Sequence, residues 1–375
     1  MKTHLSLKRF ALALALAGSS GVMAATVDLL SDPMASQYYT TYGNANVYSL
    51  PLQAQWYALQ NGGGTGPGNP FYIASSPGAI KDEVVIYTGS NGQKITTNPS
   101  GFDNAYGSPE GSNKKSDYAD TAGNNATPPD TTGKAIANNY ATTWDADVGA
   151  LKSMVGDSLV FLFNNNQTDS NNAADQSLGI WAKLWVTDAN GVVQDLTGNG
   201  LFYLYLSNMG AAYGEGGALT GDASAYNGGD VAAPLAGTAS TDYVMAGGKM
   251  CTDANLNPQA CDGTQAYEFD HNLGQNQVAY AAIFPVLDAY LASLDDNVVG
   301  YTLHLQLNMG CDPSITAAGG SCLAQGLNGG DEQLFMVTGV EGKTPPHETP
   351  EPETLALAGL ALLGMVVARR RMGKH

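Results

Sequence analysis

The segment YTLHLQLN, residues 301–308, decides the fold class. Three leucines alternate in it with polar residues: Leu303, Leu305 and Leu307 stand between Thr302, His304, Gln306 and Asn308. Successive side chains of a β-strand point to opposite faces. We therefore expect the leucines to face a core and the polar residues to face water, as in an antiparallel sheet with one solvated face.

Similar short apolar segments, bounded by Gly, Asn, Asp and Pro, recur along the chain. They predict strands over residues 47–59, 83–87, 159–163, 178–187, 201–207, 266–269, 277–284, 301–308 and 333–339. Helical spacing predicts two short helices, one after an N-cap at Asp145 and one over residues 285–294. Asn190-Gly191 predicts a hairpin turn. We therefore expect a mainly β fold, an antiparallel β-sandwich of jelly-roll-like topology with long polar loops.

The four cysteines fall into two close pairs, Cys251 with Cys261 and Cys311 with Cys322. An even number of cysteines indicates disulfides where a chain is exported, and the pairing of nearest neighbours is the simplest of the three connectivities. Zinc binding is the weaker interpretation, because no C-x-x-C occurs and no histidine stands close to either pair.

No catalytic motif stands out. His271 and His304 are interpreted as surface or loop histidines, and no G-x-S-x-G, H-E-x-x-H or P-loop pattern is present. We expect no cofactor. Calcium is the alternative, because Asp169, Asn171 and Asp175 place hard oxygen ligands in one loop, although the loop lacks the glycine and terminal glutamate of an EF-hand.

Aromatic residues offer a binding hypothesis. Trp181 and Trp185 share one face of a predicted strand, and Tyr203 and Tyr205 share a face of another. Exposed aromatic pairs of this kind can stack on sugar rings, whereas buried pairs form the core. We assign the tryptophans to the core and keep Tyr203 and Tyr205 as candidate carbohydrate contacts.

The N-terminus has the pattern of a secretory signal peptide. Basic residues precede the apolar run 10–17, and Val22-Met23-Ala24 supplies small residues for signal peptidase. The run is far shorter than the roughly 20 residues that span a bilayer. We expect export through the Sec translocon, removal of residues 1–24, and a β-sandwich domain over residues 25–345.

The formal net charge of −18 bears on partners. An acidic field of this size repels nucleic acid and anionic lipid surfaces, so a nucleic-acid partner is excluded. Glycine, at 46 of 375 residues, exceeds the average of about 7%, and charged residues, at 13%, are about half the usual share. Together these values are typical of an extracellular protein.

The C-terminal residues 346–375 combine three features. Pro350-Glu351-Pro352 is expected to be extended, because proline does not continue a helix. Residues 355–368 form an uncharged, mostly apolar run of about 21 Å if helical, shorter than the bilayer core of about 30 Å. The cluster of Arg369, Arg370 and Arg371 predicts the cytoplasmic end of this transmembrane helix.

This arrangement resembles the PEP-CTERM sorting signal of Gram-negative bacteria. The resemblance implies that exosortase, a membrane-embedded cysteine transpeptidase, recognises Pro350, Glu351 and Pro352 and cleaves near them. It also implies transient anchoring in the inner membrane, followed by release or attachment at the cell surface. The physical logic parallels the GPI signal, in which a temporary hydrophobic tail is removed.

The sequence therefore predicts an exosortase substrate that acts as a non-enzymatic cell-surface or matrix protein, associated with biofilm or exopolysaccharide. The alternative is a carbohydrate-binding module on the cell surface. A hydrolase ranks last, since a glycosidase needs two carboxyl groups facing each other across a cleft and the sequence does not establish such a pair.

Overall fold

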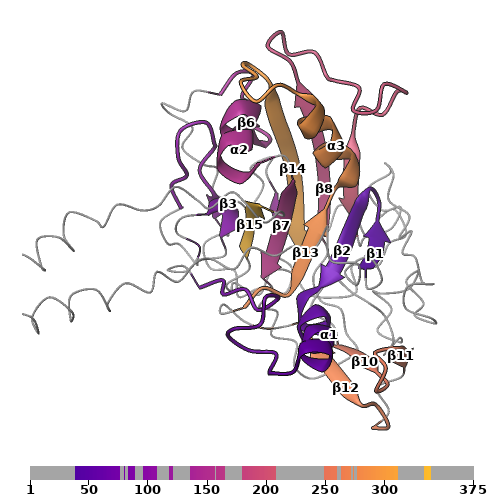
Figure 1. Ribbon diagram of the computed structural model, residues 1–375. Coiled ribbons are helices and arrows are strands. Elements are labelled where there is room, and N and C mark those ends of the chain that lie inside the picture. Colours follow the sequence, from indigo (N-terminus) through magenta and orange to yellow (C-terminus); the bar gives the residue numbers. More distant parts are fainter. Residues whose placement is uncertain are drawn as a thin grey trace, which may run out of the picture. The chain divides into compact units, whose positions relative to one another are not determined.

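The structure is a computed structural model. It describes residues 39–76, 80, 83–88, 96–107, 118–120, 136–156, 158–164, 180–207, 249–259, 263–271, 273, 277–310 and 333–338. Within these ranges the chain forms three sheets and three short helices (Figure 1). The prediction of a mainly β fold is confirmed, whereas the jelly-roll-like sandwich topology stays a prediction.

The largest sheet has seven strands. Their spatial order is β1 (Tyr39–Tyr42), β2 (Ala45–Ser49), β13 (Tyr280–Ile283), β7 (Leu159–Asn164), β15 (Gln333–Thr338), β3 (Val84–Thr88) and β4 (Tyr106–Gly107). Neighbouring strands are antiparallel except β3 and β4, which are parallel. All six residues of the central strand β7, LVFLFN, are buried. A continuous apolar run of this kind is expected where both faces of a strand are covered.

The second sheet contains the strand that decides the fold. β14 (Thr302–Gly310) pairs with β8 (Ile180–Thr187), which pairs with β9 (Leu204–Ser207). The other edge of β14 pairs with β6 (Trp144–Asp147) and β5 (Tyr118–Asp120). Leu303, Leu305 and Leu307 are buried, as the alternation predicts. A small third sheet holds β11 (Pro258–Gln259), β10 (Lys249–Thr252) and β12 (Tyr267–Asp270).

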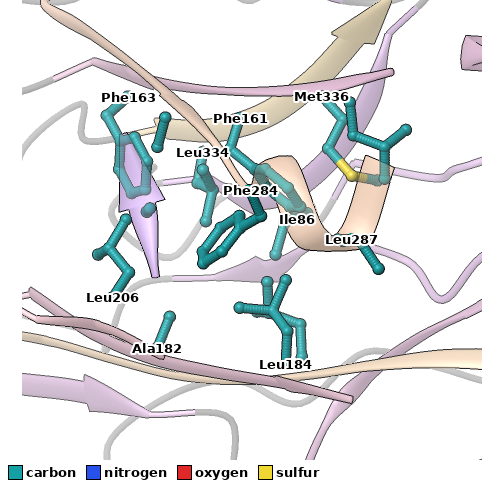
Figure 2. Packing of buried hydrophobic residues seen from close by; sticks show 14 of the residues in the cluster. Ile86, Phe161, Phe163, Ala182, Leu184, Leu206, Phe284, Leu287, Leu334 and Met336 are labelled. Carbon is teal, nitrogen blue, oxygen red and sulfur yellow. The ribbon is translucent and has the colours of Figure 1, made fainter. Parts of the chain in front are cut away.

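The two larger sheets contribute side chains to one hydrophobic cluster. Figure 2 shows Phe161 and Phe163 of β7 facing Ala182 and Leu184 of β8, with Phe284 between them. The rings of Phe161 and Phe284 meet edge to face, with centroids 5.6 Å apart. A second cluster covers other side chains of the large sheet and includes residues of the first helix. The large sheet is therefore apolar on both faces.

The first helix, α1 (Leu50–Asn61), corrects the prediction of a strand over residues 47–59. The extended chain ends at Ser49, whose side chain accepts a hydrogen bond from the backbone N–H of Leu52 at 3.3 Å. Pro51 lies in the first turn. A serine N-cap followed by proline is a helix-start signal, and here it outweighs the strand-like apolar pattern.

The helix α2 (Val148–Val155) is present as predicted, but its N-cap is Asp147 rather than Asp145. The Asp147 carboxylate accepts a hydrogen bond from Ala150 N at 2.8 Å. Asp145 belongs to β6. A buried lysine on α2, Lys152, donates to two carbonyl oxygens at the C-terminal end of α3 (Pro285–Ser293). Carbonyl groups at a helix end lack intrahelical donors, so this lysine ties the two helices together.

The turn between β1 and β2 joins the large sheet to β9. Asn44 N donates to Tyr205 O at 2.8 Å, and Tyr205 N donates to the Asn44 side-chain oxygen at 2.9 Å. Gly43 has a φ of +64°, and a Cβ atom on it would lie 2.4 Å from Tyr205 O. Only glycine fits this close approach, so the turn fixes the backbone of Tyr205.

Both predicted sorting segments lie outside the described residues. These are the signal peptide over residues 1–24 and the tail over residues 346–375, with its transmembrane helix at 355–368. In the part of the chain that the structure describes, no helix is long and apolar enough to cross a membrane. The domain boundaries at residues 24 and 345 stay predictions.

Candidate functional site

The candidate site lies on the face of the second sheet that points away from the shared core. Alternation along β8 buries Leu184 in the core and places Lys183 and Trp185 on the opposite face, where both are partly exposed. The assignment of Trp185 to the core is therefore wrong. The side chain of Trp181 lies outside the described residues. We call this surface the outer face; it comprises Lys183, Trp185 and Thr187 of β8, Thr302, His304 and Gln306 of β14, Tyr205 of β9 and Tyr203 just before it.

Three aromatic rings of the outer face surround one ammonium group. Lys183 Nζ lies 4.1 Å from the ring centroid of Tyr203 and 5.8 Å from those of Trp185 and Tyr205. A cation within about 6 Å of a ring face is attracted by the ring quadrupole. We call these four residues the Lys183 cluster. Both tyrosines singled out from the sequence thus belong to it, although β9 begins at Leu204 and Tyr203 lies in the preceding loop.

The rings also form a row across the strands. The ring centroids of Tyr140 and His304 are 4.6 Å apart and those of His304 and Trp185 are 5.2 Å apart, with interplanar angles of 28° and 24°. Trp185 meets Tyr203 edge to face at 6.1 Å. The inner rings cover each other, whereas the end residues Tyr140 and Tyr203 are 39% and 36% exposed. Stacking surface for a ligand is therefore concentrated at the two ends of the row.

His304 is completely buried, which corrects its assignment to the water-facing side of β14. The rings of Tyr140 and Trp185 stack on its two faces. Its Nδ1 lies 2.8 Å from Asp145 Oδ1, and its Nε2 lies 2.9 Å from Thr187 Oγ1. Buried polar groups are stable only when hydrogen-bonded, and the neighbouring strands β6 and β8 supply both partners.

A nucleophile, a base and an orienting carboxylate are connected in the same way as the side chains of Thr187, His304 and Asp145. All three side chains, however, have no exposed surface. The Asp145 carboxylate also accepts hydrogen bonds from Thr143 Oγ1, at 2.6 Å, and from the backbone N–H of Tyr140. In this conformation the network holds residues 140–145 against the sheet, and a substrate does not reach the threonine hydroxyl.

His271 lies in a bend just after β12, as the interpretation of a surface or loop histidine allows, but it is completely buried and so is not a surface residue. Its Nε2 lies 2.7 Å from Ser49 Oγ, and its ring stacks on Tyr280 at 4.8 Å. Ser49 is at the same time the N-cap of α1. His271 therefore connects the segment after β12 to the start of α1 and to β13.

The loop before Tyr203 is closed by Asp195. Its carboxylate accepts hydrogen bonds from the backbone N–H groups of Gly200, at 2.6 Å, and of Thr197 and Leu201, both at 3.1 Å. Desolvation raises the pKa of Asp195, but the backbone hydrogen bonds outweigh it, so the pKa is lowered from 3.8. The ionised carboxylate thus fixes the loop that presents Tyr203.

Of the four cysteines, the structure describes Cys251, which lies on β10 and is completely buried. Its register partner on β11 is Gln259, two residues before Cys261. Outside the described residues lie Cys261, Cys311, Cys322, Asp169, Asn171, Asp175, Pro350, Glu351, Pro352, Arg369, Arg370 and Arg371. Among the residues that are described, no group of three or more His, Cys, Asp or Glu could hold a metal ion.

Comparison with known proteins identifies the class first. The PEP-CTERM protein-sorting motif matches residues 348–371. The chain is thus a PEP-CTERM protein, and the motif indicates an exported protein that is processed by exosortase. This confirms the resemblance seen in the tail.

The body belongs to a second family. The family described as "Domain of unknown function (DUF8239)" matches residues 29–308, and the chain is a member of it. No curated protein and no solved structure matches the chain.

Proposed function

We propose that this exosortase-sorted protein is a non-enzymatic protein of the cell surface or extracellular matrix, and that its body contacts carbohydrate through the Lys183 cluster. The sorting motif supports the location. The single observation that carries the carbohydrate contact is the gathering of Trp185, Tyr203 and Tyr205 around Lys183 on a partly exposed sheet face.

The chemistry of the cluster suits sugars. Tyrosine and tryptophan combine an apolar ring with a polar tip, so they bind ligands that are apolar on one side and wet on the other. A sugar ring has such a surface, because its C–H groups face one way and its hydroxyl groups point outward. The ammonium of Lys183 supplies hydrogen-bond donors beside the rings. Exopolysaccharide of the surface matrix is the proposed ligand.

The other functions are supported less. Among the described residues, Thr187, His304 and Asp145 have the connectivity that a hydrolase could use, and all three are completely buried. Calcium bound through Asp169, Asn171 and Asp175 remains a proposal that chelation can test. Disulfides from Cys251 to Cys261 and from Cys311 to Cys322 are proposed as staples of the exported domain. The Sec translocon and signal peptidase are its proposed export partners.

The test is a glycan array probed with the full-length protein in detergent. We expect binding that survives EDTA and is lost in the Tyr203→Ala, Tyr205→Ala double variant. Tyr72→Ala is the matched control, because Tyr72 is a partly exposed tyrosine in the loop after α1 and outside the cluster. Binding that EDTA abolishes would assign the contact to a bound cation. Equal binding by the double variant and the wild type would reject the cluster as the contact.

A further inference from the structure

We infer that the outer face binds an unbranched, extended polysaccharide chain that lies across the strands, and that Tyr140 contacts this chain at the end of the ring row opposite Tyr203. The inference rests on the proposed carbohydrate contact and specifies the shape and direction of its ligand. Its basis is the alignment of four rings between two exposed ends, those of Tyr140, His304, Trp185 and Tyr203.

The row follows one line of the strand register. His304 on β14 is opposite Trp185 on β8 and, at its other edge, opposite Asp145 on β6. Tyr203, the residue before β9, comes opposite Trp185 when the pairing of β8 with β9 is continued by one residue. Tyr140 donates its backbone N–H to Asp145 and stacks on His304. The row therefore runs across β6, β14, β8 and β9 rather than along any of them.

The length of the row suits a chain of sugars. Neighbouring strands lie about 4.8 Å apart, so a row across four strands is about 14 Å long. The successive centroid distances of 4.6, 5.2 and 6.1 Å are consistent with this span. One β-1,4-linked pyranose unit lengthens an extended chain by nearly one strand spacing. A chain of four units therefore reaches both Tyr140 and Tyr203.

The two ends act together only on a long ligand. The inner rings cover each other, so the exposed ring surface lies mainly at Tyr140 and Tyr203. A short sugar contacts one end. A chain that reaches both ends gains the second contact without a second loss of translational and rotational freedom. Affinity should therefore increase with chain length until the ligand spans the row.

Exposed apolar side chains gather around the row. Apart from Leu59, the exposed large apolar residues of the described ranges lie in three loops, before β6, between β8 and β9, and between α3 and β14; they are Tyr140, Val192, Phe202, Tyr203 and Val299. The loops are neighbours, because Asn138 Nδ2 donates to Asp188 O at 2.9 Å. A Cβ atom on Gly300 would also lie 2.7 Å from Ala189 Cβ. Such a gathering marks an interaction surface.

A polysaccharide suits this surface better than a second copy of the chain. Each copy carries a formal net charge of −18, so two copies repel each other. The aligned rings also form a narrow row, which matches a chain-like ligand.

The experiment measures how affinity depends on ligand length. Full-length protein in detergent is titrated by calorimetry with β-1,4-linked oligosaccharides of glucose, mannose and N-acetylglucosamine, each with two to six units. In at least one series we expect the tetrasaccharide to bind about 10-fold more tightly than the disaccharide, with little further gain beyond four units.

Two variants of Tyr140 test the far end of the row. Tyr140→Leu keeps apolar cover over His304 but removes the ring, and the hydrogen bonds of Tyr140 with Asp145 and Thr143 use its backbone. The preference for the tetrasaccharide should be lost in Tyr140→Leu and kept in Tyr140→Phe. Tyr72→Ala should behave like the wild type. Urea unfolding verifies that each variant is folded.

The outcomes separate this inference from the proposed function. If the wild type binds disaccharide and tetrasaccharide equally, or if Tyr140→Leu keeps the preference, the spanning chain is overturned while carbohydrate binding stands. If no series binds, the inference is overturned, and if the array shows no glycan either, the proposed function is overturned as well. Self-association that Tyr140→Leu abolishes, without oligosaccharide binding, would assign the row to an interface between copies and also overturn the inference.

Discussion

Gly43 provides the sharpest test of how the outer face is held. In the variant Gly43→Ala the residue must keep a φ of +64°, which costs about 1–2 kcal/mol for a residue with a side chain. The new Cβ atom would lie 2.4 Å from Tyr205 O, so the turn must move. Movement weakens the two hydrogen bonds between Asn44 and Tyr205, each worth about 0.5–1.5 kcal/mol. The expected loss is about 2–4 kcal/mol.

The assay is urea unfolding followed by tryptophan fluorescence, with the buried Trp144 among the reporters. Gly198→Ala is the matched control, because Gly198 has a φ of +71° and nothing within 4 Å of an added Cβ. It should lose only the backbone term, about 1–2 kcal/mol. Equal losses in the two variants would refute the close contact with Tyr205. Gly43→Ala should also weaken carbohydrate binding, since Tyr205 belongs to the Lys183 cluster.

Three other perturbations test separate parts of the fold. Lys152→Met should lower the free energy of unfolding by about 1–3 kcal/mol in urea titrations, because Leu294 O loses the Lys152 donor and Leu291 O keeps only the backbone N–H of Leu294; an unchanged value would contradict this role. Asp195→Asn should be less stable than the wild type at neutral pH, because the lowered pKa in the folded state makes the carboxylate stabilising only while it is ionised. The difference in the free energy of unfolding between the two proteins should shrink as pH falls below 3.8, and a difference that does not change with pH would contradict this role. Burial raises the pKa of Tyr48 to about 12 from 10.0, so the neutral phenol stabilises the fold fully below pH 10. This contribution to the free energy of unfolding, about 3 kcal/mol, is lost between pH 10 and 12. Tyr48→Phe should therefore lose less stability over this pH range than the wild type, and identical pH profiles would contradict the role of Tyr48.

Local patterns predicted much of the fold because they report burial directly. The alternation of leucines in β14 and the apolar run of β7 each place side chains correctly. Residues 50–59 are apolar enough to resemble a strand, but Ser49 and Pro51 carry the start signal of the helix α1. Such a start signal is local in the sequence and outweighs the apolar pattern.

The sequence indicates some residues of the candidate site but not the contacts between distant segments. Two tyrosines at positions i and i+2 indicated a shared face, and the same rule applied to β8 pairs Lys183 with Trp185. The other face of β8 carries Ile180, Ala182, Leu184 and Val186, which are all apolar and buried. The alternation around Lys183 therefore already indicated that Trp185 lies on the outer face, against its assignment to the core. The burial of His304 depends on Tyr140, which lies more than a hundred positions away along the chain. No local pattern carries that contact.

Whether residues 346–375 are a processing signal is measured by the intact mass of the protein recovered outside the cell, in strains with and without exosortase. We expect the protein from the normal strain to lack residues 355–368, and the protein from the strain without exosortase to retain them. An exported protein that keeps residues 355–368 in the normal strain would contradict it.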